Sequence, residues 1–143
     1  MKVLIAIIVC AIYIAAQQDT TQIIGVAKIL RVYDGDTFFA DLYGEPAIFG
    51  KDLGIRLKGI DTPEINSPDT CQRRMAKKAR DYLAQRLNSS CKVELRNLSR
   101  DKYFRVDALI IADGVNINNE MITKGYAMAY TGEGPKPVHS CTQ

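Results

Sequence analysis

Four acidic side chains stand at turns where candidate strands end. Asp34 and Asp36 flank a glycine, and Asp61 and Glu64 follow an apolar strand pattern. Carboxylates at strand ends can converge at the mouth of a small barrel, and calcium accepts carboxylates, backbone carbonyls and water together as ligands. An Asp-Gly-Asp sequence alone is equally typical of an ordinary turn, so these residues indicate a cation site only in combination with others.

Two arginines add a second kind of chemistry. Arg56 lies on the strand that leads to Asp61, and Arg105 begins a later strand. The planar guanidinium group can bind two phosphate oxygens at once and stays charged at any working pH. Either arginine taken alone could equally form a salt bridge at the barrel rim, whereas together with the carboxylates they indicate phosphate chemistry.

Apolar and β-branched patterns predict the strands that position these residues. They cover residues 22–33, 37–42, 54–60, 92–98 and 105–112. The first two flank the Asp-Gly-Asp turn and are expected to form a hairpin. Residues 127–130 are expected to pack back on the core, and the tail from Thr131 is expected to be irregular.

A long helix is predicted from Asp69 or Thr70, either of which can cap it, to about Asn88. Apolar residues at spacings of three and four define its buried face: Met75, Ala79, Tyr82, Leu83 and Leu87. A short helix over residues 118–124 ends at Gly125. This pattern predicts an α+β, mainly β fold, a five-stranded OB-type barrel with one long and one short helix packed on it, although an open sheet with two helices also fits.

Three sequence motifs together resemble the thermonuclease (micrococcal or staphylococcal nuclease) family. Their order and approximate spacing match, and the resemblance covers residues 24–130. The arginine followed five residues later by Asp-Thr-Pro-Glu is a specific signal. The motifs are Val32-Tyr33-Asp34-Gly35-Asp36-Thr37, Ile55-Arg56-Leu57-Lys58-Gly59-Ile60-Asp61-Thr62-Pro63-Glu64 and Asp101-Lys102-Tyr103-Phe104-Arg105.

This resemblance implies a calcium-dependent nuclease that hydrolyses DNA and RNA with little sequence preference and leaves 3′-phosphate ends. It implies calcium bound by the carboxylates of Asp36 and Asp61 and the carbonyl of Thr62, with Asp34 supporting the site through water. It also implies the following roles: Glu64 as general base, Arg56 and Arg105 holding the scissile phosphate, and Tyr103 and Tyr130 lining the nucleotide pocket. Lys102 is a further candidate for substrate binding, because it lies near Arg105 in sequence.

Two other functions fit parts of the sequence. A non-catalytic nucleic-acid-binding OB module would need no general base, and an inert OB domain that binds a protein or membrane partner would leave the charged motifs without a role. The strongly basic face of the long helix is expected to be a solvated surface more than a phosphate track. The net charge of +3 is too small to argue nucleic-acid binding by itself.

The first sixteen residues are expected to be a secretory signal peptide. Lys2 precedes an apolar run over residues 3–16, shorter than the about 18–20 residues of a membrane-spanning helix. A buried N-terminal element and an uncleaved anchor are the alternatives. We therefore expect a single domain over residues 17–143, secreted or periplasmic, monomeric and without stable membrane association once the signal is removed.

The cysteines left after signal removal are Cys71, Cys91 and Cys141. Export favours a disulfide, and Cys71–Cys141 is the first choice because it would tie down the C-terminal tail. Cys91 is expected to be a small buried apolar residue. Zinc is disfavoured, because the cysteine spacings do not suit it and His139, the one histidine, is expected to be a solvated side chain.

Overall fold

A computed structural model of the chain describes residues 22–101 and 103–141. The predicted signal peptide and Lys102 lie outside these residues. The strands are β1 (Ile24–Val32), β2 (Thr37–Leu42), β3 (Leu53–Leu57), β4 (Ile60–Asp61), β5 (Val93–Arg100), β6 (Val106–Ala112), β7 (Val115–Asn116) and β8 (Met128–Ala129). The helices are α2 (Ala47–Gly50), α3 (Thr70–Ser89) and α4 (Ile117–Thr123).

Five of the strands close into a barrel, which confirms the predicted OB-type fold. The main sheet has the order β3-β2-β1-β5-β6-β7, and parallel pairing between β3 and β6 closes it. Register shifts between Val26 and Lys28 and between Ile29 and Arg31 bend β1. As a result β1 follows β2 over most of its length but pairs with β5 at Ile24 and Gly25.

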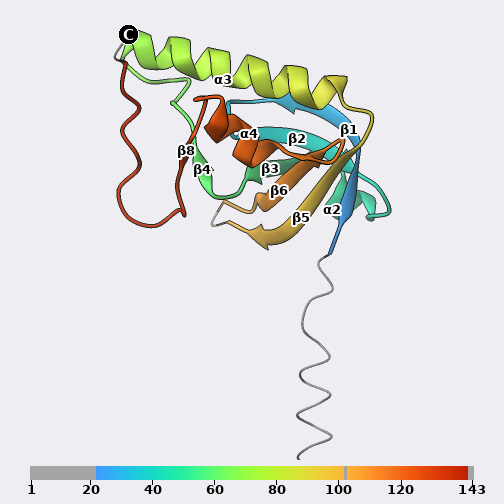
Figure 1. Cartoon of the computed structure of the whole chain (residues 1–143). Coiled ribbons are helices and arrows are strands. Elements are labelled where there is room, and N and C mark those ends of the chain that lie inside the picture. Colours follow the sequence, from blue (N-terminus) through green and yellow to red (C-terminus); the bar gives the residue numbers. More distant parts are fainter. Residues whose placement is uncertain (1–21, 102, 142–143) are drawn as a thin grey trace, which may run out of the picture.

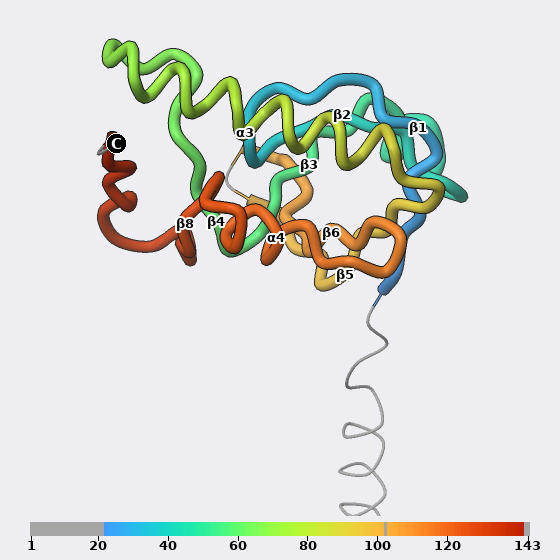
Figure 2. Tube along the Cα trace, turned by 45° about the horizontal axis from the view of Figure 1, so that its top comes forward, coloured from blue at the N-terminus to red at the C-terminus, as the bar shows by residue number. Residues whose placement is uncertain are grey.

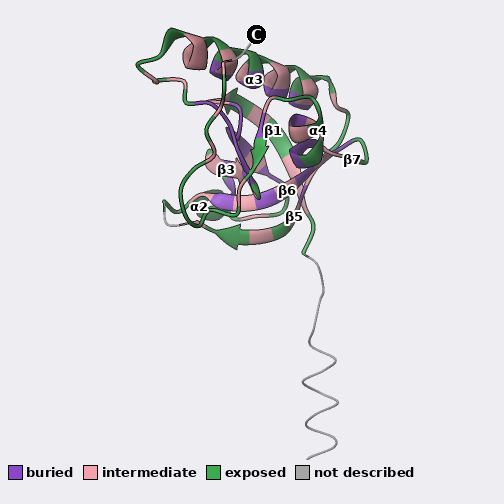
Figure 3. Ribbon diagram, turned by 60° about the vertical axis from the view of Figure 1, so that its left-hand side comes forward, coloured by how far each residue is buried: buried purple, intermediate pink, exposed green. Residues whose placement is uncertain are grey.

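The barrel interior is filled by alternate side chains of its strands. β6 alternates strictly between buried and partly buried residues, as expected of a strand with one face inward. Figure 3 shows the buried positions gathered between the strands and under α3. Large side chains that are almost completely buried include Phe38, Ile55, Leu57, Leu95 and Ile110.

Helix α3 lies across the barrel (Figure 1). Its first turn is capped by Asp69, whose side chain accepts a hydrogen bond from the backbone nitrogen of Cys71. Ala76, Ala79, Leu83 and Leu87 are its buried residues. The predicted face was wrong by one position at its start, because Ala76 rather than Met75 is buried, and Tyr82 lies at the edge of the face.

Two other elements differ from the sequence prediction. The strand expected over residues 54–60 is divided into β3 and β4, because Gly59 has a positive φ of 80° that turns the chain. The one-turn helix α2 was missed, since four residues are too few to show a helical period.

The C-terminal third returns to the strand that ends in Asp61. The Asn118 side chain accepts from the backbone nitrogen of Ile110 and donates to the carbonyls of Lys58 and Ala108, which fixes α4 to β6. β8 then pairs with β4, so that Met128 lies opposite Asp61. From β8 the tail runs back to the start of α3, as Figures 1 and 2 both show.

Candidate active site

The Asp34-Gly35-Asp36 turn joins β1 to β2 and lies against α3. A Cβ atom on Gly35 would come within 2.7 Å of the Ala79 Cβ and 2.9 Å of the Thr62 Cγ2. Those distances are too short for a methyl group, so glycine is what allows this close approach. The turn therefore contacts the residue that directly follows Asp61, although the two segments are far apart in sequence.

Two carboxylates of this turn lie close together away from solvent. Asp36 is buried, and Asp34 is partly buried and accepts a hydrogen bond from the Asp36 backbone nitrogen at 3.2 Å. Burial and the neighbouring Asp36 carboxylate raise the pKa of Asp34 to about 7. The Thr37 hydroxyl donates to the Asp36 Oδ1 at 2.9 Å. Two neighbouring carboxylates favour the binding of a cation, which reduces the repulsion between them.

Arg56 crosses from β3 to this turn. Its Nη2 lies 3.6 Å from the Asp36 Oδ2 and donates to the carbonyl of Ile60 at 3.0 Å. Its Nη1 lies 3.7 Å from the Oδ1 of Asp107, the residue opposite it in the β3–β6 pairing. That Oδ1 is buried and makes no hydrogen bond. Asp107 thus adds negative charge that holds Arg56 in place, a role that sequence reasoning missed because it depends on strand register.

Arg105 contacts the residue that follows this turn, Thr37. Its Nη1 lies 3.3 Å from the Thr37 hydroxyl, and its Nε donates to the Asp101 Oδ2 at 2.7 Å. The other Asp101 oxygen accepts from the backbone nitrogens of Tyr103 and Arg105, which shapes the turn between β5 and β6. The Arg105 guanidinium lies 5.4 Å from the centre of the exposed Tyr103 ring.

Asp61 ends β4, and Thr62 and Glu64 lie in the loop that follows it. Asp61 and Thr62 are buried, whereas the Glu64 side chain is 64% exposed. The structure thus brings the Asp36 turn next to Thr62 and places Glu64 on the open side of the same loop, where solvent and a substrate can reach it.

The C-terminal tail occupies the carboxylates of that loop. Lys136 Nζ lies 2.5 Å from the Glu64 Oε1 and 3.4 Å from the Asp61 Oδ1. The hydrogen bond to Glu64 raises the pKa of Lys136 above its ordinary value. His139 Nε2 lies 3.0 Å from the Asp61 Oδ2.

The expectation of a solvated His139 was therefore wrong, since its side chain is 8% exposed. The structure joins Cys71 to Cys141, two residues beyond His139, with 6.2 Å between their Cα atoms. Gln72 also donates to the His139 carbonyl at 2.7 Å. The cysteine positions were the signal for this proximity, because Cys71 follows closely on Glu64 in sequence.

Other sequence predictions have mixed outcomes. Cys91 was expected to be buried, but it is exposed with a free thiol because it precedes β5 at the surface. The Tyr130 hydroxyl donates to the Gly134 carbonyl within the tail. Lys92 and Arg96 both pair with Glu94, so these two basic side chains are partly neutralised by one carboxylate.

Several residues present the hard oxygen donors that calcium prefers. Asp36 and Asp61 each have a buried carboxylate, and the Thr62 carbonyl belongs to the loop that touches the Asp36 turn. Within residues 22–101 and 103–141, no three His, Cys, Asp or Glu side chains converge into a metal-binding cluster. Two carboxylates and a carbonyl fit a cation that completes its shell with water.

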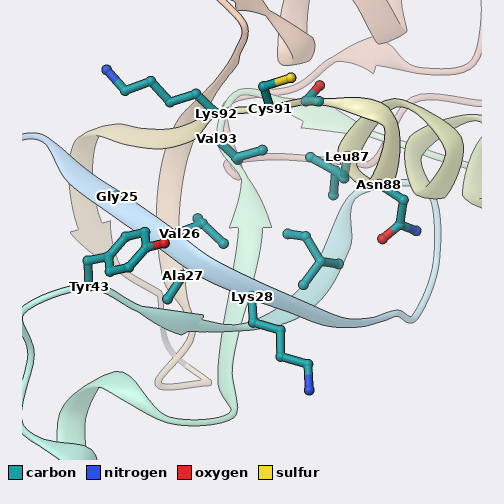
Figure 4. A pocket seen from close by; sticks show the side chains of 12 residues that line it. Gly25, Val26, Ala27, Lys28, Tyr43, Leu87, Asn88, Cys91, Lys92 and Val93 are labelled. Atoms are coloured by element: carbon teal, nitrogen blue, oxygen red, sulfur yellow. The ribbon is translucent and has the colours of Figure 1, made fainter.

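A cavity of about 410 Å³ lies away from these residues (Figure 4). It opens where β1 separates from β5, near the end of α3. Its walls include Tyr43, Asn88, Cys91 and Lys92, and the candidate catalytic residues do not line it. None of the described helices is long and apolar enough to pass through a bilayer.

Comparison with known proteins connects the site to a family. A family model described as staphylococcal nuclease homologue matches residues 54–141, more than half of the chain. That span contains Arg56, Asp61, Glu64 and Arg105, whereas Asp34 and Asp36 precede it.

Individual relatives point the same way. The thermonuclease of Staphylococcus hyicus is 31% identical over 103 residues, which cover 71% of this chain and 57% of that protein. The thermonuclease of Staphylococcus intermedius is 30% identical over 115 residues, covering 79% and 65%. Endonuclease YhcR of Bacillus subtilis (strain 168) is 33% identical over 108 residues, covering 70% of this chain and 8% of that protein. The chain thus spans less than two thirds of the length of these relatives.

Proposed function

Because the chain belongs to the staphylococcal nuclease homologue family, we propose that it is a calcium-dependent nuclease that hydrolyses the phosphodiester backbone of DNA and RNA. The observation that carries this proposal is the convergence of two guanidinium groups on one turn. Arg56 lies 3.6 Å from the Asp36 carboxylate and Arg105 lies 3.3 Å from the adjacent Thr37 hydroxyl, although they come from different strands.

Two such groups can hold a phosphodiester and stabilise its transition state. Attack on phosphorus adds negative charge to the phosphoryl oxygens, and fixed positive groups stabilise that charge more in the transition state than in the ground state. Asp101 pairs with Arg105 and Asp107 lies close to Arg56, so the two guanidinium groups need little reorganisation when substrate binds.

The residues proposed to hold calcium are Asp36 and Asp61 through their carboxylates and Thr62 through its carbonyl, with Asp34 contributing through water. A calcium ion bound there would supply further positive charge for the phosphoryl oxygens. Asp34 is then expected to give up its proton, because a nearby cation favours the ionised carboxylate.

Glu64 is the proposed general base. It lies in the loop after Asp61 with its side chain largely exposed, so a water molecule can approach both it and a bound phosphate. Glu64 would take a proton from this water while the water oxygen bonds to phosphorus. The bond between phosphorus and the 5′ oxygen breaks, and the departing oxygen takes a proton from solvent, which leaves a 3′-phosphate and a 5′-hydroxyl end.

Nucleotide binding is proposed for Lys102, Tyr103 and Tyr130. The Tyr103 ring is exposed beside Arg105, as a ring must be to stack on a base. Stacking and phosphate contacts are tolerant of sequence, so we expect little sequence specificity and the fastest cleavage where bases are unpaired.

We further propose that the protein acts as a secreted or periplasmic monomer after loss of residues 1–16. A disulfide between Cys71 and Cys141 is compatible with such a compartment, because disulfides persist under oxidising conditions. The alternative function is a nucleic-acid-binding OB module without catalysis.

The test is digestion of single-stranded DNA and RNA by the purified protein with calcium or with a calcium chelator. Calcium-dependent cleavage that leaves 3′-phosphate ends supports the proposal. Binding of the same strands without cleavage would favour the non-catalytic module, and cleavage that survives the chelator would refute the calcium requirement.

A further inference from the structure

The tail after β8 forms a closed loop against Asp61 and Glu64 of the candidate active site. It leaves β8 beside Asp61 and returns to the first turn of α3, where Cys141 bonds to Cys71 across a sequence separation of 70 residues (Figures 1 and 2). Gln72 holds the same segment through the His139 carbonyl. The tail is therefore anchored on both sides of the residues that face the site.

Two cationic or hydrogen-bonding groups of the tail engage both oxygens of Asp61. Lys136 Nζ lies 3.4 Å from Oδ1, and His139 Nε2 lies 3.0 Å from Oδ2. Lys136 also contacts the Glu64 carboxylate at 2.5 Å. Asp36 has different partners, the Thr37 hydroxyl and Arg56, so the tail acts on one side of the donor set.

The tail sequence favours this placement of Lys136. Pro135 and Pro137 flank it, and a proline fixes its own φ and restricts the residue before it. A lysine between two prolines loses less backbone freedom on closing than one in a flexible segment. The backbone of Lys136 is thus restricted before its ammonium group pairs with Asp61 and Glu64.

We propose that residues 131–141 are a disulfide-tethered strap whose Lys136 and His139 compete with the divalent cation for Asp61, and whose Lys136 also pairs with the proposed general base Glu64. This inference rests on the proposed function and adds a control to the same site. A carboxylate whose two oxygens hold tail groups must release them before it can bind a cation, so strap closure raises the apparent dissociation constant for calcium.

The disulfide determines how strongly the strap competes with calcium for Asp61. A tether keeps Lys136 at a high effective concentration near Asp61, and that concentration falls when the end is free to diffuse. A dithiol reductant opens the strap by supplying two electrons and two protons to the Cys71–Cys141 bond. Two thiols form on the protein, and the dithiol becomes a disulfide. The free end then samples a larger volume, and cation binding is expected to tighten.

The experiment is calorimetric titration of the protein with calcium in the absence of nucleic acid. Four proteins are compared, all with Cys91→Ser to prevent thiol exchange: the parent, Lys136→Met/His139→Gln, Cys71→Ser/Cys141→Ser, and the combination. Lys77→Met is the matched control, because Lys77 is an exposed lysine on α3. The tail substitutions keep the disulfide, so the test does not depend on folding of the serine variant.

If Lys136 and His139 compete with calcium, the tail substitutions should lower the dissociation constant for calcium by about 5–150-fold, the usual range of coupling between two sites. Removal of the disulfide should lower it in the same direction, and the combination should gain less than about twofold more. An unchanged or weakened calcium affinity in Lys136→Met/His139→Gln would refute the proposal. It would also be refuted if the gains in calcium affinity of the two variants multiplied in the combination.

The outcomes separate this inference from the function on which it rests. Equal calcium affinity in all four proteins, with calcium-dependent cleavage, would refute competition by the strap and still support the proposed nuclease function. Absence of calcium binding in every protein would refute both the strap and the calcium requirement.

Discussion

The buried carboxylate of Asp61 can interact either with side chains of the tail or with a bound cation. The structure gives it Lys136 and His139, and the proposed reaction gives it a cation. A buried carboxylate needs positive charge or hydrogen bonds from one source or another, because desolvation of an unpaired charge costs several kcal/mol. The tail groups therefore stabilise the folded protein at the same position where they oppose cation binding.

Replacing Glu64 with glutamine tests the general base. We expect Glu64→Gln to lower the cleavage rate by about 10²–10⁴-fold at saturating calcium, since that is the usual contribution of a positioned base. The fold should persist, because the side chain is largely exposed. Initial rates on single-stranded DNA and a circular dichroism spectrum measure the two effects. Glu133→Gln, an exposed tail carboxylate, should cleave at the parent rate, and a parent-like rate in Glu64→Gln would exclude the base role.

Replacing Asp36 with alanine tests the proposed cation ligand. Loss of even an indirect partner of a metal typically weakens binding by 10–100-fold, so we expect Asp36→Ala to need at least about tenfold more calcium for half-maximal rate. A calcium titration of the cleavage rate measures this. Asp81→Ala is the comparison, because Asp81 is exposed on α3. If both variants gave the parent titration, the cation would bind elsewhere.

Between elements, α3 and α4 are joined by one carboxylate. Glu120 accepts from the Tyr82 hydroxyl and from Arg86 Nε at 2.7 Å, and the Glu120 side chain is 17% exposed. The hydrogen bond from Arg86 lowers the pKa of Glu120 below its ordinary value of 4.5. Because α4 also carries the chain toward β8, this contact supports the strand that pairs with the Asp61 segment.

This contact predicts a pH-dependent stability. A lowered pKa in the folded state stabilises the fold above the unfolded value of 4.5, and that contribution is lost as the pH falls through the folded value. We expect Glu120→Gln to lower the free energy of unfolding by about 1–3 kcal/mol at pH 7. Urea denaturation from pH 7 to pH 3 should show the variant and the parent converging below pH 4.5. If the difference in free energy of unfolding between parent and variant stayed constant over this pH range, the ionic contact would not contribute to stability.

Over the whole molecule, the Cys71–Cys141 disulfide links the start of α3 to the end of the described chain. Small exported domains often depend on such links, because a core of limited size yields a small margin of stability. The bond also holds the tail against the active-site loop. Stability and access to the site are therefore coupled through one covalent bond.

Removal of that bond should cost stability. We expect Cys71→Ser/Cys141→Ser to unfold with a free energy about 2–4 kcal/mol lower than the parent, mainly because the unfolded chain gains freedom. Equilibrium urea denaturation under non-reducing conditions measures the difference. Cys91→Ser should change it by less than about 0.5 kcal/mol, since Cys91 is exposed and unbridged. An equal stability of parent and double variant would show that the tail is dispensable to the fold.

Patterns along the chain were sufficient to predict most of the barrel strands, the long helix and the charged residues of the candidate site. These depend on local periodicity, on capping at Asp69 and on motifs of fixed spacing, all of which can be read along the chain. The resemblance carried by Arg56, Asp61, Glu64 and Arg105 depends only on residue identity and spacing, so the sequence is sufficient to indicate the family.

Which of these residues meet, and which groups compete for them, depends on how the chain folds. The contact of Asp107 with Arg56 depends on parallel register between β3 and β6, and the approach of Gly35 to Thr62 depends on how α3 packs. The same is true of Lys136 and His139, which lie more than seventy positions after Asp61 in sequence yet contact its two oxygens. No local pattern encodes such pairs, because their energy arises from surfaces brought together when the chain closes on itself.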